Sequence, residues 1–150
     1  MRIMVCIDGS TQSDKALEKG LVIAGGCGAD QVIIITVHEN KYLFPDAGTE
    51  SLALTHEDLR YFEKIGEQEK EAKEIMLKNA AKRFEEKGLP VETVLACGHP
   101  AEAIARTALE RDVELIIIGN RGLGGLKKFL LGSVSNAVLQ EAKCSVLVVK

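Results

Sequence analysis

Hydrophobic positions gather in five short runs along the chain, and the runs are rich in β-branched residues. They cover residues 3–7, 32–37, 91–96, 115–118 and 146–149. Three of them are continuously apolar rather than alternating with polar residues. Continuous apolar runs are typical of strands buried on both faces, as in a parallel sheet covered by helices. The pattern therefore predicts five strands of a parallel sheet.

A helical pattern separates the first two runs. Its small and apolar residues recur at helical spacing, at Leu17, Leu21, Ala24 and Gly28. The polar residues 10–14 before it supply an N-terminal cap and an acidic first turn. We expect Gly25, Gly26 and Gly28 to end this helix. Gly20 lies inside it, which costs about 1 kcal/mol relative to alanine unless close packing needs a glycine.

The longest helix should cover residues 59–87. A single apolar stripe runs along it and contains Leu59, Phe62, Ile65, Ala72, Ile75, Met76, Ala80 and Phe84. Glu and Lys fill the opposite face, many of them four residues apart. A coiled coil would need a clean heptad repeat, which Glu69 interrupts. An amphipathic helix lying on a sheet is therefore the better interpretation.

Two shorter helices follow. One opens at Pro100, a position that needs no backbone N–H, and the other begins between Ser133 and Ser135 and runs to about Lys143. Residues 38–58 fit neither periodicity. For them we expect a long mobile loop, or a short helix with a loop, that covers a site or a partner surface.

Strands and helices thus alternate through the chain, which predicts an α/β fold with a doubly wound parallel sheet. We expect one domain over residues 1–150, with the Rossmann-like strand order 3-2-1-4-5 and helices on both faces. In such sheets a ligand lies beyond the carboxyl ends of the strands, where the winding reverses. Functional residues should therefore follow Ile7, Val37, Ala96 and Ile118.

Composition excludes several classes of function. The net charge of −3 removes the field that concentrates nucleic acid non-specifically, so no nucleic-acid partner is expected. No stretch approaches the about 18 apolar residues of a membrane span, and strand-like residues begin at once, so we expect a cytoplasmic protein without a membrane partner. The four cysteines form no CxxC pair, which favours reduced thiols over a zinc or redox site.

The strongest chemical signal follows the fourth apolar run, where five glycines fall within the fourteen residues 119–132. Glycine lets a ligand approach the backbone closely, and successive N–H groups in such turns form a nest for an anion. The helix near Ser133 adds free N–H groups and the positive end of its dipole, and the hydroxyls of Ser133 and Ser135 are further donors. These features predict a phosphate-binding loop, although the spacing matches neither a Walker A loop nor GxGxxG.

The glycine spacing over residues 119–133 resembles the G-2x-G-9x-G-S/T motif of the universal stress proteins that bind ATP. The sequence Asp-Gly-Ser at residues 8–10 resembles that family's opening, and residues 98–102 resemble its turn into the third helix. Residues 142–149 resemble its last strand, except that Ser145 stands where proline is common. The resemblance covers nearly the whole chain and implies an adenine nucleotide alpha hydrolase-like fold.

The resemblance also implies a ligand and its contacts. The ligand would be ATP, or else AMP or ADP, with an accompanying Mg²⁺ and no separate metal site. The residues expected to surround its ribose and phosphates all lie between the fourth strand and the last helix: Gly119, Asn120, Arg121, Gly122, Gly132, Ser133, Val134 and Ser135. In this set Gly119 and Gly122 would let the chain wrap the ribose and the first phosphates. The outer phosphates would be bound through backbone N–H groups and hydroxyls of Gly132, Ser133, Val134 and Ser135, and Arg121 would neutralise phosphate charge.

The adenosine part would lie against the first two strands. Asp8 would accept hydrogen bonds from the ribose hydroxyls, and Val37 would offer backbone groups to the adenine edge. Cys6 and Ile7 would line the same pocket. A cap or turn role for Asp8 in the first helix is the competing interpretation.

No nucleophile–base pair or paired carboxylates occur, and nothing supplies a base to position water, so we assign no catalytic residues. The resemblance implies a nucleotide-dependent regulator or sensor, with slow Mg²⁺-dependent ATP hydrolysis as one alternative. A second alternative is an interaction module that binds no nucleotide. A phospho-acceptor receiver would need an aspartate after the third strand, where Ala96-Cys97-Gly98 stands. A nucleotidyl-transferring ATPase would need a serine-rich glycine loop after the first strand.

The last strand, from Val146 to Val149, is apolar on both faces. An open apolar edge promotes aggregation unless it is paired or covered. We therefore predict that it pairs antiparallel with its copy in a second subunit, and the resemblance implies the same homodimer.

Overall fold

The computed structural model describes residues 1–39, 55–123 and 131–150. The elements alternate as the hydrophobic pattern predicts. They are β1 (Arg2–Cys6), α1 (Thr11–Cys27), β2 (Gln31–His38), α2 (His56–Glu85), β3 (Val91–Cys97), α3 (Pro100–Glu110), β4 (Leu115–Gly119), α4 (Ser133–Glu141) and β5 (Ser145–Val149). Most of the segment for which we expect a loop or a short helix, residues 40–54, lies outside the described residues.

The five strands form one sheet in the order β3-β2-β1-β4-β5, and every neighbouring pair is parallel, which confirms the predicted topology. The register places Val5 of β1 between Ile34 of β2 and Ile117 of β4. The chain first adds strands on one side of β1 and then returns to add β4 on the other side. The winding therefore reverses between β1 and β4.

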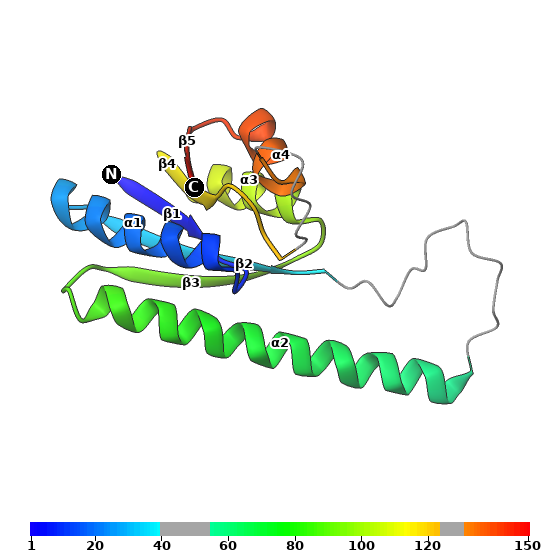
Figure 1. The fold of residues 1–150 in the computed structure, drawn as a ribbon. Coiled ribbons are helices and arrows are strands. Elements are labelled where there is room, and N and C mark those ends of the chain that lie inside the picture. Colours follow the sequence, from blue (N-terminus) through cyan, green and yellow to red (C-terminus); the bar gives the residue numbers. More distant parts are fainter. Residues whose placement is uncertain (40–54, 124–130) are drawn as a thin grey trace.

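Figure 1 shows α1 and α2 on one face of the sheet and α3 and α4 on the other. Because strand side chains alternate between the faces, each strand contributes to two cores. Val5 and Ile34 pack with Phe84 of α2 in the first core. Met4 and Ile116 pack under α3 and α4 in the second. All five of these side chains are fully buried.

Helix α1 begins at a side-chain cap, because the backbone N–H of Ser13 donates to Ser10 Oγ at 3.2 Å. It ends at Gly28, whose φ of 60° lies in the left-handed region that favours glycine. Gly25 and Gly26 lie inside the helix, so the prediction that they help to end it is wrong. One left-handed residue is enough to stop the helix.

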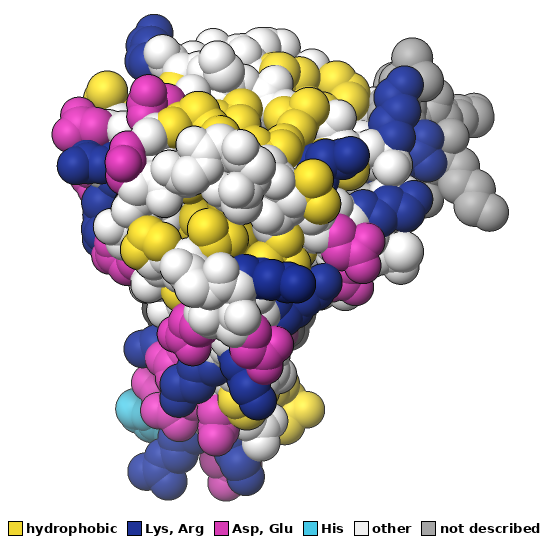
Figure 2. Space-filling view, turned by 90° about the vertical axis from the view of Figure 1, so that its left-hand side faces the viewer, with side chains coloured by type: hydrophobic (Ala, Val, Ile, Leu, Met, Phe, Trp, Pro, Cys, Tyr) yellow, Lys and Arg dark blue, Asp and Glu magenta, His cyan; other side chains and the backbone are white. Residues whose placement is uncertain are grey.

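Helix α2 begins at His56, earlier than predicted, because Thr55 and Asp58 form a capping box there. Its fully buried residues all lie in the C-terminal third: Leu77, Ala80, Ala81 and Phe84. The N-terminal half extends beyond the sheet (Figure 1), and Figure 2, which looks along α2 from its C-terminal side, shows mainly Lys, Arg, Asp and Glu at the bottom of the molecule, where this helix lies. The predicted apolar stripe is therefore buried only in part, and Ile75 is 52% exposed.

Candidate functional site

The loop after β4 is closed at its base by hydrogen bonds of the backbone. The carbonyl of Asn120 accepts from the N–H of Gly132 at 2.7 Å, so the two ends of the loop lie side by side. The N–H of Asn120 donates to the carbonyl of Val149 at 2.7 Å, which ties the loop to the end of β5. Residues 124–130 of this loop, including two of the predicted glycines, lie outside the described residues.

The start of α4 faces the same edge of the sheet and has no side-chain cap. Its N-cap residue is Gly132, whose carbonyl accepts the first intrahelical bond, from Asn136. Within the described ranges, the N–H groups of Ser133, Val134 and Ser135 have no acceptor. Such groups, at the positive end of a helix dipole, bind anions. In α1 and α2, by contrast, a side chain already fills the corresponding position.

The Ser135 side chain is turned into the base of the loop. It is only 2% exposed, and its Oγ lies 3.0 Å from the carbonyl oxygens of both Asn120 and Gly132. A hydroxyl has one proton to donate, and here that proton holds the base of the loop. The phosphate contacts expected of the Ser135 hydroxyl and backbone N–H both stay predictions. The Ser133 side chain is exposed.

Asp8 and Gly122 come from opposite ends of the chain and meet at this edge. A Cβ placed on Gly122 would lie 2.4 Å from Asp8 Oδ2, so only a glycine leaves the carboxylate its present position. The other oxygen, Oδ1, accepts from the backbone N–H and the hydroxyl of Ser10 at 2.9 and 2.6 Å. Asp8 thus stabilises the turn into α1 with one oxygen and directs the second toward the loop.

At Gly119 the backbone of α1, rather than a side chain, leaves no room for a Cβ. A Cβ there would lie 2.8 Å from the backbone carbon and oxygen of Gln12 in the first turn of α1. Close approach of the protein's own backbone therefore requires Gly119. Arg121 is half-buried, and its Cα would lie 3.4 Å from a Cβ on Gly132, so it belongs to the closed base of the loop.

The side chains of Cys6 and Ile7 point to opposite faces of the sheet, as consecutive residues of an extended strand do. Cys6 packs into the core under α3 and α4, whereas Ile7 packs into the core under α1 and α2. That both residues line the nucleotide pocket stays a prediction. Burial, with a smaller contribution from the Asp8 charge, raises the pKa of the Cys6 thiol far above its ordinary value. This thiol therefore stays protonated.

The carbonyl of Val37 already has a partner, because Lys73 Nζ donates to it. Val37 is half-buried at the end of β2, and its carbonyl can accept a second hydrogen bond besides the one from Lys73, so its contact with an adenine edge stays a prediction. Sequence reasoning missed Lys73. A signal was present, since Lys73 stands four residues before the buried Leu77 and so on the sheet-facing side of α2.

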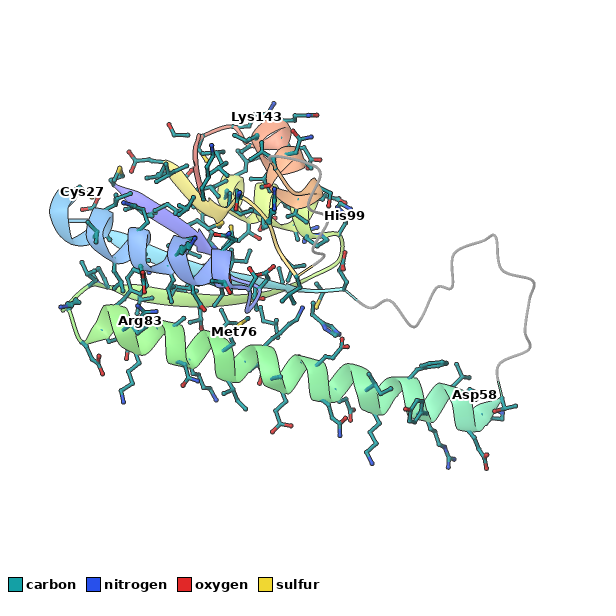
Figure 3. All side chains as sticks on the ribbon, in the orientation of Figure 1. Cys27, Asp58, Met76, Arg83, His99 and Lys143 are labelled. Carbon is teal, nitrogen blue, oxygen red and sulfur yellow. The ribbon has the colours of Figure 1, made fainter. Side chains whose placement is uncertain are left out.

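A cavity of about 340 Å³ opens between α1 and α2. Ile7 and Gly9 line it from the end of β1, and Met76 and Arg83 line it from α2. Figure 3 shows both of these α2 side chains on the side of the helix that faces the sheet. The cavity thus belongs to the α1–α2 layer, whereas the uncapped helix start belongs to the α3–α4 layer.

No helix within residues 1–39, 55–123 and 131–150 is long and apolar enough to cross a membrane. The same ranges contain no group of three His, Cys, Asp or Glu side chains that could hold a metal ion. A doubly wound parallel sheet with free helix N–H groups where its winding reverses is an arrangement in which α/β folds bind anionic ligands such as nucleotides.

Comparison with known proteins identifies the family. The family model described as "Universal stress protein family" matches residues 1–150. Universal stress protein YxiE of Bacillus subtilis is 35% identical over 150 residues, covering 99% of this chain and 98% of its own length. The chain belongs to the universal stress protein family.

Solved structures agree with this assignment. The structure of protein MJ0577 of Methanocaldococcus jannaschii superposes with a TM-score of 0.82 at 26% identity and covers 99% of this chain and 94% of its own. A universal stress protein solved in complex with cAMP gives 0.68 at 25% identity, covering 100% and 97%. Two further family structures, solved with dAMP and with AMP, are 23% and 20% identical and support the fold alone.

Proposed function

We propose that the protein binds an adenine nucleotide, ATP in the first place, and acts as a nucleotide-dependent regulator or sensor in a stress response. One observation carries this proposal. The backbone N–H groups of Ser133, Val134 and Ser135 have no acceptor among the described residues, and they start a helix beside the reversal point of the sheet. The cAMP complex of a relative at 25% identity supports an adenine nucleotide as the ligand.

The phosphates would lie at the start of α4. Backbone N–H groups and the helix dipole favour negative charge there, and the glycine N-cap leaves the space in front of them clear of a side chain. The hydrogen bond between Gly132 and Asn120 preforms this geometry, so little ordering of the loop base is needed on binding.

The ribose would lie between β1 and β4, beside Asp8. Because Ser10 holds Oδ1 of this carboxylate, Oδ2 can accept from a ribose hydroxyl without the side chain reorienting. A hydrogen bond to a charged acceptor contributes about 1.5–3 kcal/mol. The cap and binding interpretations of Asp8 are thus compatible, one for each oxygen.

The proposed Mg²⁺ would be held mainly by the phosphates. Mg²⁺ commonly keeps several waters and takes one or two carboxylates plus substrate oxygens. The described residues offer no cluster of three ligands, which fits an ion that arrives with the nucleotide better than a resident one.

We further propose a homodimer formed by β5. This strand pairs with β4 on one side and forms the outer edge of the sheet on the other. Its residues from Val146 to Val149 are half-buried rather than fully buried, so an apolar surface is left at the edge. An antiparallel copy would cover it across a two-fold axis.

The location we propose is the cytoplasm, because the free, exposed thiols of Cys27 and Cys97 suit a reducing compartment.

Calorimetric titration with ATP, ADP and AMP, each with Mg²⁺, tests the proposal on wild type and on Gly122→Ala. A Cβ at residue 122 must displace the Asp8 carboxylate, so we expect Kd for ATP to rise about ten- to a hundredfold. Gly25→Ala is the matched control, since no atom lies within 4 Å of its Cβ position. Absence of binding by wild type, or equal binding by Gly122→Ala, would contradict the proposal.

A further inference from the structure

The last residues of β2 and β3 place an imidazole beside a thiol. His38 and Cys97 are partners in the parallel register, and the N–H of Gly98 donates to the carbonyl of His38 at 3.1 Å. Neighbouring strands lie about 4.8 Å apart, and paired residues project from the same face of the sheet. The two side chains are therefore neighbours at the carboxyl edge.

The face they share is the one covered by α2. His38 follows Ile34 by four residues, and Cys97 follows Leu95 by two, and both of these apolar side chains pack in the core under α1 and α2. Lys73 of α2 fastens the helix over the end of β2 through the carbonyl of Val37. The His38 side chain is buried.

The environments of the two groups differ in a way that matters for reactivity. His38 is only 7% exposed, and its Nδ1 is buried with no hydrogen-bond partner among the residues that the structure describes. Cys97 is exposed and its thiol is free. A buried nitrogen without a partner is costly. The Cys97 thiol, which does not bond to Nδ1 in this structure, relieves that cost when it turns toward the imidazole.

We propose that Cys97 is a site of covalent thiol modification, with the His38 imidazole as the acceptor of the thiol proton. With an alkyl halide, the Cys97 sulfur forms a bond to carbon as the halide leaves, and the proton passes to Nδ1. With hydrogen peroxide, the sulfur takes one oxygen to give a sulfenic acid. The released hydroxide then combines with the proton from His38 to give water. The site is independent of the proposed nucleotide function.

The chain contains its own controls. Cys27 is also exposed and in no disulfide, but it ends α1, where its thiol donates to the carbonyl of Ala24 at 3.8 Å. The histidines of the described residues all lie on other elements. Figure 3 places Cys27 at the opposite end of the molecule from His99, two residues beyond Cys97. Cys6 is 6% exposed, so its labelling reports unfolding.

The test is alkylation by limiting iodoacetamide at pH 7, with each cysteine quantified by peptide mass spectrometry. The alkylation rate of each cysteine in the protein unfolded by urea corrects for the effect of its neighbouring sequence. In native wild type we expect Cys97 to react at least about tenfold faster than Cys27. In His38→Gln, with Cys6 still protected, this advantage should disappear. Equal alkylation rates of Cys97 and Cys27 in wild type would overturn the proposal without any variant. If Cys97 still reacts faster than Cys27 by the same factor in folded His38→Gln, the histidine is not the proton acceptor. Peroxide followed by a sulfenic-acid probe should label the same residue.

Discussion

Gly20 lies inside α1, where the helix crosses the sheet. A Cβ at this position would stand 2.7 Å from Cγ2 of Val5 and 3.6 Å from Cζ of Phe84. Both neighbours are 0% exposed, so neither can move into solvent. Gly20→Ala therefore tests whether close packing against β1 is what requires the glycine.

The expected magnitude follows from two opposing effects. In a free helix interior, Gly→Ala stabilises by about 1 kcal/mol. Carbon atoms prefer a separation of about 3.5–4.0 Å, so a contact of 2.7 Å must be relieved by shifting Val5 within a packed core. Such overpacking costs about 1–3 kcal/mol, and the severe overlap favours the upper part of that range. Gly20→Ala should lower the free energy of unfolding by about 1–2 kcal/mol.

Urea unfolding monitored by circular dichroism measures this effect. Gly25→Ala is the control in the same helix, because nothing lies within 4 Å of its Cβ position, and we expect it to raise the free energy of unfolding by about 0.5–1 kcal/mol. The double variant Gly20→Ala, Val5→Ala should show coupling, since the two side chains overlap directly. A Gly20→Ala protein as stable as wild type would refute the reasoning.

Two further predictions concern the edges of the molecule. Light scattering at micromolar concentration should give the mass of two subunits for wild type and of one subunit for Val148→Lys. The control Val22→Lys, at an exposed site of α1, should stay dimeric. A monomeric wild type would rule out the β5 interface. The hydrogen bonds from Thr55 hold the pKa of the Asp58 carboxyl below its usual value, so its stabilisation of the α2 start is present at neutral pH and is lost as pH falls below about 4. Asp58→Ala should therefore speed amide exchange in the first turns of α2 at pH 7, whereas exchange equal to that of wild type would show that the capping box contributes nothing.

Much of the fold was predictable because the spacing of hydrophobic residues along the chain indicates where strands and helices form. The five apolar runs coincide with β1 to β5 to within a residue or two, and the alternation of strands and helices predicted a doubly wound parallel sheet. The errors lie where a local pattern does not decide the outcome. The pattern did not show that only part of the stripe on α2 is covered, because how far a sheet extends beneath a helix is not a property of the helix sequence.

The candidate site divides in the same way. The sequence by itself determined that a glycine-rich loop and a helix start follow β4, at the reversal point of the sheet, since residue type and spacing are sufficient for that. Only the tertiary structure decided that Asp8 meets Gly122, that the Ser135 hydroxyl is used internally, and that Lys73 donates to the Val37 carbonyl. These outcomes depend on distances between segments far apart in the chain, and such distances are set by packing of the two layers against the sheet rather than by any local pattern.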